Sequence, residues 1–287
     1  MRFGQLGTIE LSQTRFLRRL PSPRIWTDNL GRRLFFALLT IQGIGAFALI
    51  TLGVTISKFG AARQVIRPML WREIHRSGTR LMPMFFGLSC ALGFLVIGQT
   101  ASLAQKVGVV NYIGTVMVVV IVRELGPLLT AILVLARVGT ANVIELGMSR
   151  ARGEVEALEA LGIDPVHYQV VPRVIGMALS IFALTVYVIL GALISGYLWI
   201  FLQDVPLLPG DYFHALAKAL QGLDFVLLAL KTLCFGLIIS LITCYHGLAQ
   251  PLQMEDVSRA AVRAVAQGVI ACVLLDVAFI VLYLIAS

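Results

Sequence analysis

All-α membrane protein is the fold class that the sequence predicts, and three observations support this prediction. Of the 287 residues, 59% are hydrophobic and only 13% are charged, whereas a soluble domain is about 25% charged. Five apolar stretches after residue 80 are each long enough to cross a bilayer. The lysines and arginines gather in alternate connections between these stretches, as the positive-inside rule requires.

An earlier apolar stretch, residues 34–57, has basic residues on both flanks. A simple span would place one of these basic clusters outside, against the positive-inside rule. We therefore predict an N-terminal interfacial or re-entrant helix here. The alternative is a true span with inverted topology. Residues 64–79 follow as a basic cytoplasmic elbow.

The five transmembrane helices are predicted with the N-terminus in the cytoplasm and the C-terminus outside. Of 23 lysines and arginines, only Lys106 and Lys218 fall in predicted outer connections. We expect a single domain overall, in which residues 1–80 form a cytoplasmic N-terminal segment and residues 81–287 form the five-span core. The predicted spans are residues 81–104, 112–137, 174–202, 225–247 and 264–285.

The second predicted span contains two charged neighbours, Arg123 and Glu124. About ten residues of helix place them about 15 Å from the span's start, near the middle of the bilayer. Neighbours in sequence cannot face each other on a helix, so each needs a partner elsewhere or a wet cavity. One interpretation is a contact for a polar substrate, with Arg123 suited to a phosphate. The other is a structural network between helices. Pro127 removes a backbone donor one turn later and should kink the helix.

After the second span, residues 152–161 (RGEVEALEAL) have the composition of a short amphipathic helix. Val155, Leu158 and Leu161 share one stripe, and Gly162 with Pro165 ends the segment. An ordinary interfacial helix is one interpretation. The acidic residues would be repelled by anionic lipid, so docking into a groove of a soluble partner is favoured.

The other charged or glycine-rich features are explained by ordinary structural roles. Lys231 and Asp276 lie in different predicted spans on the outer side and could form a structural ion pair. Residues 93–100 (GFLVIGQT) match the spacing of a phosphate-binding loop, but they lie inside a span and lack its lysine. The net charge of +8 reflects basic cytoplasmic flanks, so no nucleic-acid partner is expected. The cysteines form no CxxC pair, and no metal site is predicted.

Two motifs together resemble the MlaE-type permease family of bacterial and plastid lipid ABC transporters. They are RELGPLLTAILVLARVGTANVIELG, starting at Arg123, and EALEALGIDPVHYQVVPR, ending at Arg173. The resemblance covers about residues 65–285. Residues 247–265 depart from the family's usual glycine-rich run in this place.

The resemblance implies a homodimer of permeases in the bacterial inner membrane, bound to cytoplasmic ABC ATPase subunits and, outside, to an MCE-domain lipid-binding protein. It implies phospholipid as the substrate and maps the family's lipid pocket onto Arg123 and Glu124. It also maps the coupling helix, which contacts the ATPase, onto about residues 149–162. The coupling residues so implied are Arg150, Glu154, Leu158, Leu161, Gly162 and Asp164.

The function expected from the sequence is therefore that of a permease subunit without enzymatic activity or cofactor of its own, with ATP and Mg held by the partner ATPase. Two alternatives stay open. One is a proton-coupled secondary transporter that uses Glu124 and Asp276 as proton carriers. The other is a membrane scaffold that transports nothing.

Overall fold

The computed structural model describes residues 40, 42–54, 63–107, 113–202, 209–248 and 254–286. The chain divides into two compact units, Met1–Phe47 and Ala48–Ser287, and the second contains all the long helices. Gln42–Val54 is a short apolar helix. The rest of the stretch predicted as interfacial or re-entrant, residues 34–57, lies mostly outside the described residues, so that interpretation stays a prediction.

The fold class is confirmed: the described residues are helical, and five helices are long and apolar enough to cross a membrane. They are Arg67–Leu103, Gly114–Ala151, Val166–Leu202, Gly222–Leu248 and Val257–Ile285. The first three are 37 or 38 residues long, or about 55 Å, against about 30 Å of hydrocarbon. They therefore extend beyond the predicted spans: the first helix begins at Arg67 rather than at residue 81, and the second continues past residue 137 to Ala151.

The first three of these five helices are each assembled from shorter segments. The first contains α3 (Arg63–Ser77), η2 (Thr79–Leu81), α4 (Met82–Leu92), η3 (Gly93–Ile97) and α5 (Gly98–Val107). The second contains α6 (Ile113–Met117), η5 (Val118–Leu125), α7 (Gly126–Val134), η6 (Leu135–Gly139) and α8 (Thr140–Ala151). The remainder are α9 (Glu154–Ala160), η7 (Val166–Val170), α10 (Val171–Leu202), α11 (Pro209–Ala219), α12 (Gly222–Leu248) and α13 (Val257–Ala286).

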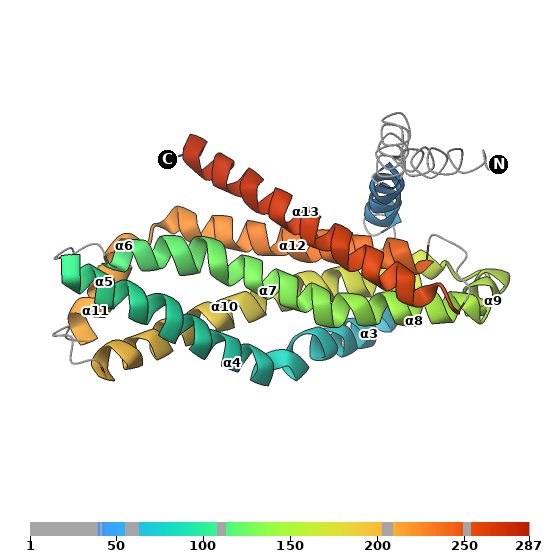
Figure 1. Cartoon of the computed structure of the whole chain (residues 1–287). Coiled ribbons are helices and arrows are strands. Elements are labelled where there is room, and N and C mark those ends of the chain that lie inside the picture. The colour runs from blue at the N-terminus through green and yellow to red at the C-terminus, as the bar shows by residue number, and fades with distance from the viewer. Residues whose placement is uncertain are drawn as a thin grey trace, which may run out of the picture. The chain divides into compact units, whose positions relative to one another are not determined.

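Helix α10 lies at the centre of the second unit and contacts α3, α4, α7 and α12. Helix α13 is peripheral: it runs beside α12 and α8, and Figure 1 shows it separating from the other helices toward its C-terminus. Only 17% of its most apolar window is buried, against 56% for the helix that contains α10. Most of α13 therefore faces lipid or another protein.

Small residues let the central helices approach closely. A Cβ atom on Gly236 of α12 would lie 2.3 Å from the Cα atom of Ala178 in α10, and one on Gly126 would lie 2.9 Å from the side chain of Ile189. In a membrane, where water does not drive helices together, such contacts are the main source of packing energy. The close α10–α12 contact therefore requires glycine at position 236.

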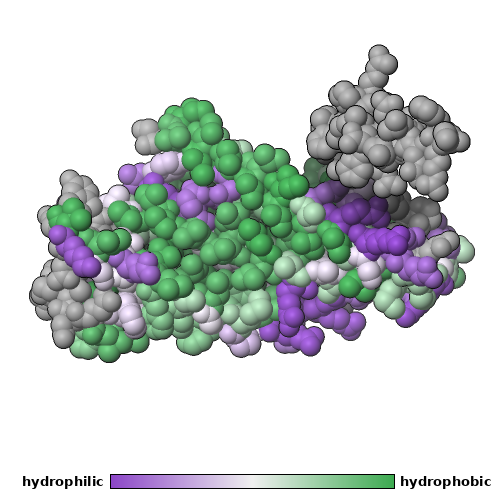
Figure 2. All heavy atoms as spheres, viewed as in Figure 1, coloured by the Kyte–Doolittle hydropathy of each residue, from purple (hydrophilic) through white to green (hydrophobic). Residues whose placement is uncertain are grey.

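The outer surface of the second unit is apolar over a broad band, as Figure 2 shows, and polar residues concentrate at the end that carries α3, α8 and α9. Leu190, Ile194, Phe225 and Leu274 are each about half or more exposed in this band. Such a surface is unfavourable in water and suits hydrocarbon. Residues 93–100 fall within η3 and α5, so the sequence that imitates a phosphate-binding loop is helical.

Candidate functional site

Arg123 pairs with Asp224, which is a residue that the sequence placed in an outer connection. Arg123 Nε lies 2.9 Å from Asp224 Oδ1, and Nη2 donates to Oδ2 at 3.2 Å. The Asp224 side chain is almost fully buried, and its carboxylate also accepts the backbone N–H of Gln221 at 2.9 Å. Asp224 therefore caps the N-terminus of α12 and holds the guanidinium of the neighbouring span.

The guanidinium of Arg123 is also covered by an aromatic ring. Its Cζ lies 4.3 Å from the ring centroid of Tyr283, near the C-terminus of α13. A cation over an aromatic face is stabilised by the ring's quadrupole. The partners of Arg123 thus come from the first turn of α12 and the last turn of α13, so its head group lies near the ends of these two helices.

Glu124 points to a different partner. Lys231 Nζ lies 3.0 Å from Glu124 Oε2 and 2.7 Å from Asp276 Oδ1. Lys231 is buried, with 5% of its side chain exposed. This lysine of α12 is shared by two carboxylates, one from η5 and one from α13. The predicted contact between Lys231 and Asp276 is present, and each of Arg123 and Glu124 has its own partner on other helices.

Pro127 explains a further bond of the lysine. In an α-helix the carbonyl of Arg123 would accept the N–H of residue 127, which proline lacks. Lys231 Nζ donates to this carbonyl at 2.8 Å. The helix widens into the π-helix η5 directly before Pro127, as irregular turns often do at functional positions. The kink predicted at Pro127 stays a prediction; the structure shows a π-helical segment that carries both charged residues and ends two residues before this proline.

We call Arg123, Glu124, Asp224, Lys231 and Asp276 the intramembrane cluster. It holds two cations and three carboxylates, so one negative charge is in excess if all are ionised. Glu124 is its most accessible member, with 33% of its side chain exposed, against 1% for Asp224. All members of the cluster except Asp276 line a cavity of about 40 Å³ together with Phe279 and Tyr283, which is room for a few water molecules at most.

The predicted coupling helix, about residues 149–162, is divided in the structure: residues 149–151 belong to α8, and α9 (Glu154–Ala160) is a separate short helix beyond it. Gly153 and Gly162 flank it with φ of 76° and 74°. At its C-terminus the N–H of Ile163 donates to the carbonyl of Leu158, and that of Gly162 donates to Glu159, both at 2.9 Å. This is a Schellman motif, in which glycine supplies the left-handed residue. The helix therefore ends at a defined turn.

The surface of α9 is mostly exposed. Val155 is buried against the bundle, Leu158 is half-buried, and Leu161 is 75% exposed. Of the expected apolar stripe, Val155 is therefore buried and Leu161 is exposed at the end of the helix. Glu154, Glu156 and Glu159 are exposed around it. An acidic helix with an exposed leucine at its end is available to a partner with a complementary groove.

Two of the predicted coupling residues have roles within this chain. Arg150 donates to the carbonyl of Leu248 at the end of α12, and its Nε lies 3.9 Å from Glu156. Asp164 accepts the N–H of Val166 at 3.0 Å with Oδ1 and that of Tyr168 with its carbonyl, so it begins the next helix. Arg150 and Asp164 thus attach α9 to the bundle on both sides.

The comparisons with known proteins agree with this geometry. The family model described as Permease MlaE matches residues 70–282. The chain belongs to the MlaE permease family. It is 28% identical over 229 residues to a protein of Rickettsia prowazekii named "Probable ABC transporter permease protein", covering 78% of this chain and 85% of that one.

Two further relatives come from photosynthetic organisms. A protein of Synechocystis that is also named a probable ABC transporter permease is 30% identical, with 75% of this chain and 85% of the relative covered. The chloroplastic protein trigalactosyldiacylglycerol 1 of Arabidopsis thaliana is 27% identical, with 72% of this chain and 60% of the relative covered. As an MlaE permease, the chain is a multi-pass membrane protein, and its ABC transporter relatives imply an ATPase partner.

Sequence reasoning missed two members of the site. Asp224 carried a signal, because an acidic residue in the first turn of a span is typical of helix N-termini. Tyr283 lies in an apolar run and carried no such signal. Of the predicted residues, the structure brings Arg123, Glu124, Lys231 and Asp276 into one cluster.

Proposed function

We propose that this MlaE permease is the membrane subunit of an ABC transporter that moves phospholipid between the bacterial inner membrane and the outer envelope. A separate cytoplasmic ATPase would bind ATP and Mg and drive it, and this chain would have no nucleotide site or enzymatic activity. A second copy of the chain and an MCE-domain lipid-binding protein would complete the assembly. The N-terminus would be cytoplasmic and the C-terminus periplasmic.

The observation that carries this proposal is one continuous helix. Gly114–Ala151 includes Arg123 and Glu124 in one part and ends one turn before α9. The 27 residues from Glu124 to Ala151 span about 40 Å at 1.5 Å per residue. Helix α9 packs against α8 at the end of this helix, so a partner that moves α9 would also push on the helix that carries Arg123 and Glu124.

The cluster suits the phosphate of a lipid in an open state. Arg123 is the more exposed of the two cations, since 18% of its side chain is exposed, against 5% for Lys231. A phosphate could compete with Asp224 for Arg123, and planar guanidinium groups bind phosphate oxygens in pairs. The cavity of about 40 Å³ is too small for a head group, so transport requires that the helices separate there.

Glu154→Lys tests the coupling assignment. The charge reversal on exposed α9 should reduce copurification of the ATPase at least about tenfold, since a mismatched charge at an interface costs more than about 1.4 kcal/mol. Glu255→Lys, in the described connection before α13, is the matched control and should retain the ATPase. Full ATPase stoichiometry in Glu154→Lys would refute the assignment.

Arg123→Ala tests the lipid contact. The variant should copurify less phospholipid, measured by mass spectrometry, while the ATPase remains attached. Arg80→Ala removes an exposed arginine of η2 and should leave the lipid content unchanged. Unchanged lipid in Arg123→Ala would contradict the proposal and would favour a scaffold that transports nothing.

A proton-coupled secondary transporter is the second candidate, and the excess carboxylate of the intramembrane cluster is the observation that favours it. In that case transport in vesicles would follow an imposed pH gradient without any ATPase. The proposed ABC transporter would show transport that depends on ATP and ceases when the ATPase is removed. Reconstitution with and without the ATPase distinguishes the two.

A further inference from the structure

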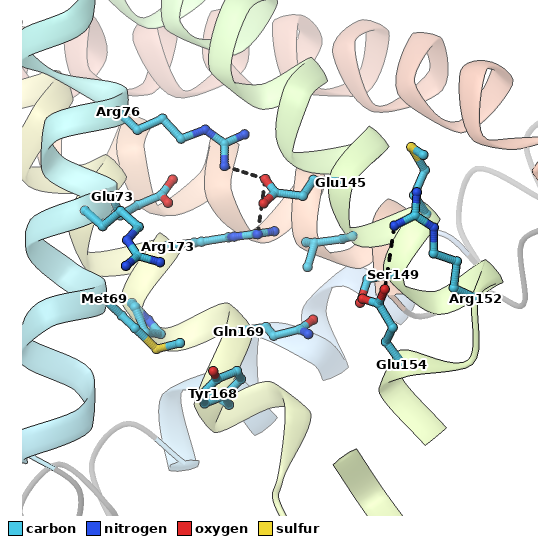
Figure 3. Close-up of a pocket in the computed structure, with 14 residues that line it drawn as sticks. Met69, Glu73, Arg76, Glu145, Ser149, Arg152, Glu154, Tyr168, Gln169 and Arg173 are labelled. Carbon is cyan, nitrogen blue, oxygen red and sulfur yellow. Dashed lines mark hydrogen bonds and ion pairs between the residues drawn. The ribbon is translucent and has the colours of Figure 1, made fainter. Parts of the chain in front are cut away.

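A second polar cavity lies away from the intramembrane cluster, at the end of the bundle that carries α9. Its volume is about 460 Å³, and its walls come from α3, α8, α9, η7 and the start of α10. Figure 3 shows polar side chains from these helices converging on it. None of its lining residues belongs to the intramembrane cluster, so this cavity requires its own explanation.

Glu145 is the centre of one wall. Its carboxylate pairs with Arg76 of α3, and Arg173 Nη2 of α10 lies 3.3 Å from its Oε2. Figure 3 shows the two arginines reaching it from the same side of the cavity. One carboxylate facing two guanidiniums leaves one positive charge in this group of three.

The walls also carry buried polar atoms whose hydrogen-bonding capacity is not used. Among the described residues, Arg173 Nη1, Ser149 Oγ and Gln169 Oε1 are buried and have no hydrogen-bond partner. Leaving such groups unpaired is unfavourable, and native structures usually pair them with protein, water or a ligand. Three such atoms on the walls of one cavity indicate that something polar fills it.

The charge of the lining selects the kind of occupant. Four arginines (Arg72, Arg76, Arg152 and Arg173) face three glutamates (Glu73, Glu145 and Glu154), which leaves one positive charge in excess. The glutamates are already engaged: Glu154 lies 3.7 Å from Arg152, and buried Glu73 accepts from Ser77 at 3.3 Å. Arg72 is exposed and forms no ion pair within the described part of the chain. The surplus favours an anion.

We propose that this cavity binds a phosphoryl anion between α3, α8 and η7. A tetrahedral phosphate would accept from Arg173 Nη1 and Ser149 Oγ, and from the amide of Gln169 once its side-chain nitrogen faces inward, while Arg72 balances its charge. Arginine is well matched to phosphate because its donors lie in a planar fork. The volume exceeds that of a free phosphate, so the head group of an anionic phospholipid and inorganic phosphate are both possible sources.

The test titrates the full chain, with its copurified partners, in a neutral detergent free of phosphate. The probes are inorganic phosphate, dihexanoyl phosphatidic acid and uncharged dihexanoylglycerol. Binding is followed by melting temperature and by hydrogen-exchange protection of peptides from α3 and η7. Protection by phosphatidic acid alone identifies a lipid head group, and protection by both anions identifies a free anion site; either result supports the proposal.

Variants localise the effect. Arg173→Gln should weaken the anion's apparent affinity about 10- to 100-fold, which corresponds to one charge-assisted hydrogen bond, and Arg173→Lys should restore part of it. Arg67→Ala removes an exposed arginine of α3 that does not line the cavity and should have no effect. If Arg173→Gln fails to fold, Arg72→Gln with Ser149→Ala makes the same test at the other walls.

Two results would overturn the proposal. One is equal protection by dihexanoylglycerol, or no protection by any probe. The other is an equal loss of affinity in Arg67→Ala and Arg173→Gln, which would indicate nonspecific attraction to a basic surface. Neither depends on ATPase copurification or on lipid retention in Arg123→Ala, so failure here is distinct from failure of the proposed transport function.

Discussion

Lys231 Nζ lies 2.8 Å from the carbonyl oxygen of Arg123, so a lysine of the fourth span occupies the place of a backbone donor in the second. The arrangement depends on proline at position 127, which cannot donate to that carbonyl. The same ammonium reaches Glu124 and Asp276. One side chain thus joins three membrane-spanning helices, where an unpaired charge is costly.

Lys231→Met should destabilise the protein severely. It would leave the carboxylates of Glu124 and Asp276 without their shared cation, and breaking a buried ion pair costs about 3–5 kcal/mol. The measurement is the melting temperature and the amount of folded protein in membranes. Lys218→Met, on the exposed face of α11, is the control and should behave like the unaltered protein. Equal melting temperatures for the two variants would contradict the role of Lys231.

Arg123 and Asp224 should show strong coupling in a double-mutant cycle. Asp224→Asn and Arg123→Gln each leave a buried charge without its partner, whereas the double variant removes both charges. We expect the double variant to lose less free energy of unfolding than the two single variants lose together, by about 1–3 kcal/mol. Additive effects on the free energy of unfolding would show that the pair contributes nothing.

Gly162→Ala should disturb α9 without disturbing the spans. At φ of 74° an alanine is strained, by about 1–2 kcal/mol, so the Schellman motif at the end of α9 should open. We expect weaker ATPase copurification and an unchanged melting temperature of the membrane region. Gly210→Ala, at a helical position with free space around it, is the matched control. Equal ATPase retention in both variants would argue against a requirement for this turn.

The protein should lose stability at high pH because Tyr212 is buried. Burial raises the pKa of its phenol from the usual value of 10.0, and the hydroxyl donates to the carbonyl of Leu193 at 3.1 Å. Because the folded pKa lies above the unfolded one, this contribution is fully present below pH 10 and is lost as pH rises toward the folded pKa. Tyr212→Phe should lose about 1 kcal/mol at neutral pH.

The measurement for Tyr212 is the melting temperature in detergent from about pH 8 to about pH 11, compared with the melting temperature at neutral pH. The unaltered protein should become less stable above pH 10, and Tyr212→Phe should show a smaller decline. Tyr168→Phe, at a partly buried tyrosine of η7, is the control. Parallel declines in Tyr212→Phe and the unaltered protein would exclude titration of this phenol as the cause.

Side-chain chemistry along the chain predicted much of the site. Charged neighbours on a helix cannot pair, so Arg123 and Glu124 required partners from elsewhere, and the structure supplies Asp224 and Lys231. The partner of Arg123 was not predictable, since Asp224 follows a polar connection and resembles an outer-loop residue. Helix ends were also misjudged, because hydropathy marks the apolar part of a helix and gives no signal where the helix continues into water.

The sequence by itself determined that this chain is a membrane protein of five long helices, because apolar length and charge asymmetry act locally. It also determined where α9 ends, since glycine at position 162 supplies the left-handed turn that L side chains rarely adopt. Only the tertiary structure decided which charges meet. The shared use of Lys231 by two carboxylates and of Glu145 by two arginines joins residues up to 107 positions apart, and pairing at that separation depends on how the helices pack.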